Sequence, residues 1–190
     1  MEILAFNGSP RKGGNTSTII REILVGAKSE GATTTEVPLH HIDMKGCMGC
    51  LSCRKTPGVC KQQDGLSPFL EAMKTCDGIV IGSPIYMYRI TGQMKQFVDR
   101  CYSLYKDRED GGYDCVLQPG KTFALVISQG APDPEQYKKS IRWLAGMTGI
   151  GFGMKEVGRI IHSDSIESPA KDNKDLLKEA NEIGKKLVGH

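Results

Sequence analysis

The sequence has 190 residues, of which 39% are hydrophobic and 25% are charged, and a formal net charge of +3. The length suits one domain with its own core, and so small a charge argues against nucleic acid or an anionic membrane as a partner. Because no apolar run approaches the roughly 20 residues that cross a bilayer, and the first residues lack a secretion signal, we expect one cytoplasmic domain over 1–190.

The chain begins with an apolar stretch, residues 2–8, which predicts a buried strand that ends in a turn. A polar, glycine-rich loop follows at 8–17, and residues 18–29 carry apolar side chains at helical spacing. A helix that starts there directs unpaired N–H groups and the positive end of its dipole toward the loop. The loop therefore predicts a phosphate site, and its candidate contacts are Ser9, Arg11, Asn15, Thr16 and Ser17.

This loop has neither the P-loop ending nor the dinucleotide-binding glycine pattern. Its hydroxyls, amides and single arginine suit a phosphate monoester that is bound without magnesium. The alternative is an ordinary loop in which a Ser or Thr caps the helix, since these residues are favoured at that position.

A second strand is predicted at 33–39, and a cysteine-rich loop at 46–61 follows it. The loop has intervals of two, two and six residues between its cysteines, short enough to present four thiolates to one centre. An iron-sulfur cluster, a zinc ion and unmetallated thiols are the three interpretations, and the two-residue intervals favour the cluster. The four candidate ligands are Cys47, Cys50, Cys53 and Cys60.

Seven cysteines without a secretion signal argue against a disulfide framework. Cys76, Cys101 and Cys115 stand apart from the loop, and we expect them to be ordinary structural cysteines.

The rest of the chain alternates helices with strands. Residues 106–114 carry charges and glycines, and are expected to form an exposed excursion. Five strands alternating with helices predict a parallel sheet that is covered on both faces. Helices are expected at 64–74, 91–100, 135–147 and 172–188, and strands at 77–83, 121–128 and 152–161.

Ligands of such a sheet bind beyond the carboxyl ends of the strands, where two further loops meet the loop at 8–17. A phosphate-binding cradle beside aromatic residues fits a ligand with an anionic tail and a flat aromatic head, such as FMN. The alternative is that Tyr86 and Tyr88 are only amphipathic residues at the end of a strand. No side chain there looks like a dedicated acid or base, so we predict no catalytic residue. The candidate contacts are Pro84, Ile85, Tyr86, Met87, Ser128, Gln129 and Gly130.

Three motifs carry a family resemblance over nearly the whole chain. Gly8-Ser-Pro-Arg-x-x-Gly-Asn-Thr, Gly82-Ser-Pro-Ile-Tyr and Lys95-x-x-x-Asp-Arg resemble the flavodoxin-like NAD(P)H-dependent FMN reductases. The resemblance implies an α/β, doubly wound, five-stranded parallel sheet of order 2-1-3-4-5. The four-cysteine insertion after the second strand narrows it to the iron-sulfur flavoproteins.

That resemblance implies one FMN and one 4Fe-4S cluster per subunit, in a homodimer or homotetramer in which one subunit's cluster lies near a neighbour's FMN. Electrons would enter from ferredoxin and pass between cluster and flavin to an acceptor such as oxygen or peroxide. Two alternatives stay open. One is an NAD(P)H-dependent FMN or quinone reductase with a structural cysteine loop, and the other is a sensing module without enzymatic activity.

Overall fold

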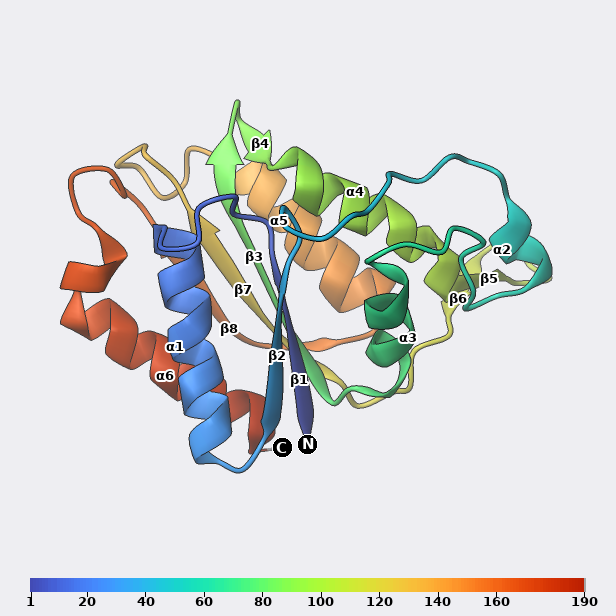
Figure 1. The fold of residues 1–190 in the computed structure, drawn as a ribbon, viewed down its shortest axis with the longest axis horizontal. Coiled ribbons are helices and arrows are strands. Elements are labelled where there is room, and N and C mark those ends of the chain that lie inside the picture. Colours follow the sequence, from blue (N-terminus) through green and yellow to red (C-terminus); the bar gives the residue numbers. More distant parts are fainter. Residues whose placement is uncertain (190) are drawn as a thin grey trace.

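A computed structural model describes residues 1–189 and has a central sheet of five parallel strands in the order β2-β1-β3-β7-β8 (Figure 1). Counting only these parallel strands, the order is 2-1-3-4-5, which confirms the predicted flavodoxin-like fold class. A short strand, β4, pairs antiparallel with β3, and β5 and β6 form a separate ribbon. The strands are β1 (Glu2–Asn7), β2 (Thr33–Pro38), β3 (Gly78–Tyr86), β4 (Arg89–Ile90), β5 (Tyr105–Asp107), β6 (Tyr113–Cys115), β7 (Thr122–Ser128) and β8 (Lys155–His162).

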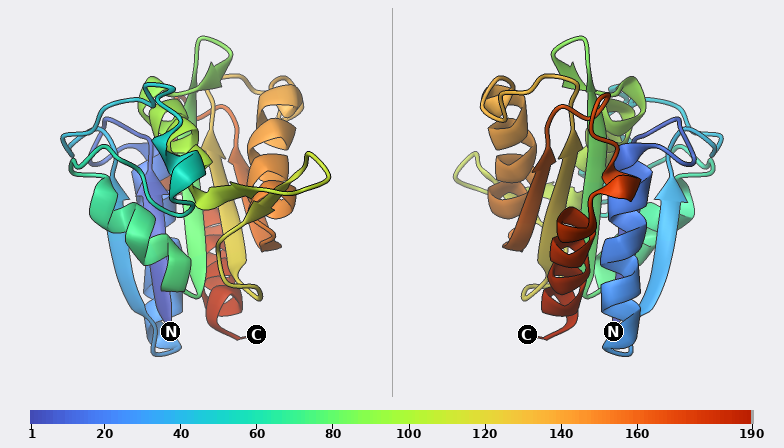
Figure 2. Two further views of the ribbon diagram at one scale, coloured as in Figure 1. Left: turned by 90° about the vertical axis from the view of Figure 1, so that its right-hand side faces the viewer. Right: turned by 90° about the vertical axis from the view of Figure 1, so that its left-hand side faces the viewer.

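Helices cover both faces of the sheet (Figure 2): α1 and α6 pack on one face, and α3, α4 and α5 pack on the other. None of the helices within residues 1–189 is long and apolar enough to cross a membrane. The helices are α1 (Asn15–Ser29), α2 (Ser52–Lys55), α3 (Ser67–Thr75), α4 (Gly92–Arg100), α5 (Lys138–Gly146) and α6 (Lys174–Val188), with single turns η1 (Cys101–Leu104), η2 (Met147–Gly151) and η3 (Ala170–Asp172).

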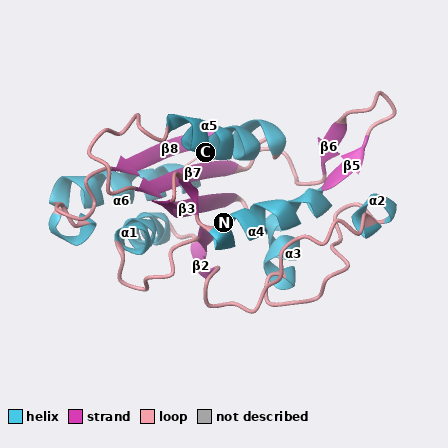
Figure 3. Cartoon of the chain, turned by 90° about the horizontal axis from the view of Figure 1, so that it is seen from above, coloured by secondary structure: helices cyan, strands magenta, loops and turns pink. Residues whose placement is uncertain are grey.

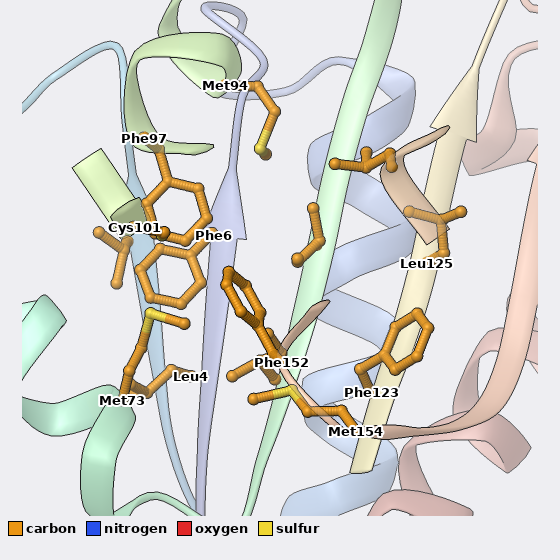
Figure 4. Packing of buried hydrophobic residues seen from close by; sticks show 14 of the residues in the cluster. Leu4, Phe6, Met73, Met94, Phe97, Cys101, Phe123, Leu125, Phe152 and Met154 are labelled. Atoms are coloured by element: carbon orange, nitrogen blue, oxygen red, sulfur yellow. The ribbon is translucent and has the colours of Figure 1, made fainter. Parts of the chain in front are cut away.

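The alternating side chains of β1 explain how one strand serves two cores. Leu4 and Phe6 belong to the cluster beneath α3, α4 and α5, whereas Ile3 and Ala5 belong to the cluster beneath α1 and α6. The Phe6 ring stacks on that of Phe97 from α4, with the ring centroids 4.1 Å apart (Figure 4). Burial on both faces accounts for the nearly continuous apolar strands of the sequence.

Two glycines let α1 and α6 approach each other closely. A Cβ at Gly184 of α6 would overlap the carbonyl oxygen of Ile23 in α1, and a Cβ at Gly26 would overlap that of Asn181. The two helix backbones are therefore in direct contact, which fixes the position of α1 and of the loop that precedes it.

Several elements differ from expectation, and α3, α5 and β8 each begin three residues later than predicted. Helix α1 begins at Asn15 rather than 18, and β3 continues to Tyr86 because it pairs with β4 there. The exposed excursion at 106–114 is an antiparallel ribbon, because Tyr105 pairs with Cys115 and packs its ring on Phe152, with the ring centroids 6.0 Å apart. Cys76 and Cys101 are buried, as expected for structural cysteines.

Candidate functional site

A pocket of about 500 Å³ opens at the carboxyl ends of β1, β3 and β7. This volume lies within the usual range for small-molecule and cofactor sites. Among the residues that the structure describes, Arg11 is the only charged one that lines it. Nine of the predicted contacts line the pocket: Ser9, Arg11, Asn15, Thr16, Pro84, Ile85, Tyr86, Ser128 and Gly130.

The start of α1 forms the polar end of this pocket. Gly14 is the N-cap residue and no side chain caps the helix, so the N–H groups of the first turn lack a side-chain partner. The hydroxyls of Thr16 and Ser128 lie 2.5 Å apart, and their hydrogen bond joins the first turn of α1 to the end of β7. Uncapped N–H groups, hydroxyls and one arginine are a suitable environment for a phosphate.

A fourth loop, which follows β8, also lines the pocket through Ser165, Ile166 and Pro169, and sequence reasoning missed it. Asn15 holds this loop with both ends of its amide. Its Nδ2 donates to the Ser165 carbonyl at 2.6 Å, and its Oδ1 accepts from the Ala170 N–H at 2.8 Å. The rule that ligands bind beyond strand ends applies to the fifth strand too, and could have revealed the loop.

Three predicted contacts lie outside the pocket. Ser17 is buried, and its hydroxyl donates to the Arg11 carbonyl at 2.9 Å. The side chain of Gln129 is also buried and donates to the Asp133 carbonyl at 2.7 Å. Met87 is 88% exposed at the tip of the β3–β4 hairpin. The first two therefore shape the loops around the pocket.

The hairpin tip is a two-residue turn made by Met87 and Tyr88, both with positive φ, at 46° and 69°. A turn of this hand suits the twist of a hairpin but normally uses Asn or Gly. The Ser140 hydroxyl of α5 holds the turn by donating to the Tyr88 carbonyl at 3.1 Å. The turn thus projects past Tyr86, which forms the rim of the pocket.

Helix α4 links the pocket to the cysteine loop. At its start, Thr91 caps the helix by accepting from the Met94 N–H, and its hydroxyl donates to the Gly8 carbonyl at 2.9 Å. At its end, Arg100 donates to the carbonyls of Lys45 and Gln62, which lie just before and just after the cysteine loop. We call these two flanking segments the stems of the loop. Figure 3 shows α2 of that loop together with β5 and β6 beyond the end of α4.

Arg100 is fully buried and holds the stems together. Its guanidinium donates to the Lys45 carbonyl at 2.8 Å and to the Asp64 carboxylate at 2.5 Å. Burial alone would raise the pKa of Asp64, but hydrogen bonds from Arg100 and from the backbone outweigh burial and lower it to about 2.

The four loop cysteines are free thiols; Cys47 and Cys50 are exposed, and Cys53 and Cys60 are partly buried. Within residues 1–189, no three Cys, His, Asp or Glu side chains are gathered closely enough to hold a metal ion. Hydrogen bonds from the backbone and hydroxyl of Ser52 lower the pKa of Cys50.

The surroundings of the loop fit a centre that needs cationic and N–H partners. The Nη2 atom of Arg54 lies 4.0 Å from the Cys53 sulfur, and the Nε–H groups of Arg54 and Arg100 are both buried without a hydrogen-bond partner among the described residues. A hollow of about 390 Å³ lies against Cys47. The loop thus has four cysteine thiols, two arginine side chains with unpaired N–H donors, and a hollow beside Cys47. These features suit an anionic, sulfur-ligated cluster.

Comparison with known proteins agrees with this arrangement. Residues 1–132 match the family described as NADPH-dependent FMN reductase. An iron-sulfur flavoprotein of Methanocaldococcus jannaschii is 37% identical over 169 residues, which span 80% of this chain and 83% of that protein. An iron-sulfur flavoprotein of Methanosarcina thermophila is 30% identical over 98% of this chain and 93% of its own length.

Solved structures share the fold at low sequence identity. An NAD(P)H:quinone oxidoreductase from Methanothermobacter marburgensis has a TM-score of 0.77 and 14% identity over 100% of this chain and 98% of its own. An FMN-dependent NADH-azoreductase from Bacillus anthracis, in complex with FMN, has a TM-score of 0.75 and 15% identity over 99% of both chains. The family match and the two curated relatives show that the chain belongs to the iron-sulfur flavoproteins within the NADPH-dependent FMN reductase family, and is a flavin-dependent redox protein.

Proposed function

We propose that the pocket binds FMN, with the phosphate at the start of α1 and the ring against Ile85 and Tyr86. The observation that carries this proposal is the uncapped helix start facing a pocket in which Arg11 is the one charged residue of the described chain. Ile166 from the fourth loop and Ile85 supply apolar surface for the ring. In this proposal residues 1–190 form one FMN-binding domain that carries the cysteine loop.

The loop at 46–61 is proposed to hold a 4Fe-4S cluster through Cys47, Cys50, Cys53 and Cys60. A cluster of this kind transfers one electron at a time, whereas a flavin can hold one or two. Binding would draw the four thiolates together, and folding of the loop would be coupled to that step. The buried guanidiniums would then face a centre that carries negative charge.

In this proposal, the residues around the pocket bind and orient the flavin and do not transfer protons. No carboxylate, histidine or lysine lines the pocket within the described chain. Arg11 and the helix start offset the charge of a phosphate, and the Asn15 amide holds the fourth loop against the site. The ligand environment is therefore built mainly from neutral hydrogen bonds, and the redox chemistry comes from the cofactors.

We further propose ferredoxin as the electron donor, oxygen or peroxide as acceptor, and a homodimer or homotetramer as the working assembly. The relatives named iron-sulfur flavoproteins support the pairing of flavin and cluster. Rapid reduction of the bound flavin by reduced ferredoxin, compared with NADPH, tests the donor. Light scattering at several protein concentrations tests the assembly.

Anaerobic purification with iron, sulfide and flavin counted per chain tests the cofactor content. We expect about four iron atoms, four sulfides and one flavin per chain. Cys50→Ala should lose the iron and keep the flavin, whereas Cys115→Ala, which removes a cysteine outside the loop, should keep both. Iron-free protein prepared without oxygen would contradict the cluster.

The second candidate is an NAD(P)H-dependent flavin or quinone reductase in which the cysteine loop is structural. The observation in its favour is that the four thiols do not converge within the described residues. This candidate predicts a yellow, iron-free protein that NADPH reduces rapidly, and that keeps its activity when Cys50 is replaced.

A further inference from the structure

Arg54 lies inside the cysteine loop, directly after Cys53, yet its side chain turns away from solvent. Only 14% of the side chain is exposed. Its Nη2 donates to the backbone carbonyls of Tyr102 at 2.8 Å and Tyr105 at 2.6 Å, and its Nη1 donates to the Asp107 carboxylate at 3.0 Å. The guanidinium thus joins the loop to η1 and β5.

The same guanidinium is fixed by aromatic rings. Its central carbon lies 4.2 Å from the centroid of the Tyr102 ring and 5.7 Å from that of Tyr113. Cation–π contacts and a planar fork of donors hold an arginine in one orientation, which a lysine cannot reproduce. The positive charge is therefore held in place, and Nη2 lies 4.0 Å from the Cys53 sulfur.

One donor of Arg54 is not used by the protein. Its Nε–H is buried and has no hydrogen-bond partner among the described residues. An unpaired buried donor on a charged group is costly and normally finds a partner. The adjacent Cys53 is one of the proposed ligands of the cluster, whose sulfur atoms accept hydrogen bonds.

We propose that Arg54 is a positioning residue that sets the reduction potential of the cluster, by holding a positive charge and an N–H donor beside the Cys53 sulfur. This inference rests on the proposed function, because it requires that the loop hold the cluster. Reduction adds one negative charge to the cluster. A fixed cation nearby stabilises the reduced form more than the oxidised form, and so raises the potential.

Arg54 differs in this respect from Arg100, the other guanidinium at the loop. Arg100 is paired with Asp64, whose carboxylate is itself mostly buried. This adjacent negative charge largely compensates the positive charge of Arg100. The partner of Arg54 is Asp107, whose side chain is 58% exposed and screened by water. Arg54 therefore exerts the larger uncompensated field on the cluster.

The test is a redox titration of the cluster in the purified, cluster-loaded protein at low ionic strength, followed by its absorbance or by electron paramagnetic resonance. Arg54→Gln should shift the potential to a more negative value, and Arg54→Lys, which restores the charge, should recover part of that shift. Arg159→Gln is the matched control. Arg159 also pairs with a carboxylate, but on β8, away from the loop, and its replacement should leave the potential unchanged.

A second variant does not depend on the loop surviving the loss of Arg54. Asp107→Asn removes the exposed counter-charge and should shift the potential to a more positive value than Asp110→Asn, whose carboxylate pairs with Arg108 instead. An iron-loaded Arg54→Gln protein at the wild-type potential overturns the inference. If Arg54→Gln loses its iron, equal potentials for the two aspartate variants overturn it. Iron-free wild-type protein would instead contradict the proposed cluster itself.

Discussion

Arg100 and Asp64 form a buried ion pair, Nη1 to Oδ2 at 2.5 Å, which ties the end of α4 to the base of the cysteine loop. The pair is separated by 36 residues in the chain, and both partners also bond to the backbone around the loop. The position of the loop is thus specified by side chains outside its four cysteines.

Asp64→Asn should therefore destabilise the protein. It would leave the Arg100 charge buried without its counter-charge, which typically costs about 3–5 kcal/mol. Denaturant unfolding at neutral pH measures the effect. Asp99→Asn is the control, since its pair with Lys95 is exposed and should contribute below about 1 kcal/mol. Equal effects of the two substitutions would contradict the importance of the buried pair.

The same pair predicts a loss of stability in acid. The pKa of Asp64 is about 2 in the folded chain, below its ordinary value of 3.8. A depressed carboxyl pKa stabilises the fold fully above the higher value, and this contribution is lost as the pH falls from 3.8 through about 2. The difference in unfolding free energy between wild type and Asp64→Asn should therefore narrow over this range. A constant difference from pH 5 to pH 2 would refute this assignment.

Arg11→Gln should weaken FMN binding about tenfold or more, because a charge-assisted hydrogen bond contributes about 1.5–3 kcal/mol. Riboflavin, which lacks the phosphate, should bind wild type and variant equally well. Quenching of flavin fluorescence measures both affinities. Lys12→Gln, which changes the neighbouring residue outside the pocket, should leave both unchanged. An equal loss for both flavins would place the phosphate elsewhere.

Gly184→Ala should separate α1 from α6. The added methyl group would overlap the Ile23 carbonyl, and overpacking of this kind costs about 1–3 kcal/mol or more. Thermal unfolding should show a lower midpoint, accompanied by weaker FMN binding, because α1 carries the proposed phosphate site. Gly146→Ala in α5 meets no atom within 4 Å and should not lower the midpoint.

The fold was predictable because its signals are local. The inner strands β1, β3 and β7 are short apolar runs, and β1 lies within one residue of its predicted bounds. The polar contacts that shape the site are not local. Asn15 bonds to the backbone of Ser165 and Ala170, which lie 150 and 155 positions further along the chain. No spacing in the sequence indicates such a pairing.

The roles of individual polar residues were harder to predict for the same reason. Ser17 and Gln129 have the residue types expected of a binding loop, but hydrogen bonds within the loops engage their side chains. The structural roles of Arg54 and Arg100 had no local signal, because the partners of Arg54 lie in η1 and β5 and those of Arg100 lie on either side of the cysteine loop. Which polar group faces a ligand is decided by packing between distant segments.

Helix α4, capped on the Gly8 carbonyl at one end and anchored by Arg100 at the other, acts as a spacer between the two proposed redox centres. Nine residues rise about 13 Å, so the separation within one chain is set by a rigid element. Inserting one helical turn would add about 5 Å and would move Arg100 away from its partners beside the cysteine loop. Under the proposed function, electron transfer inside one chain would have to cross this gap, and an assembly in which a neighbouring subunit's flavin lies nearer the cysteine loop would offer a shorter route.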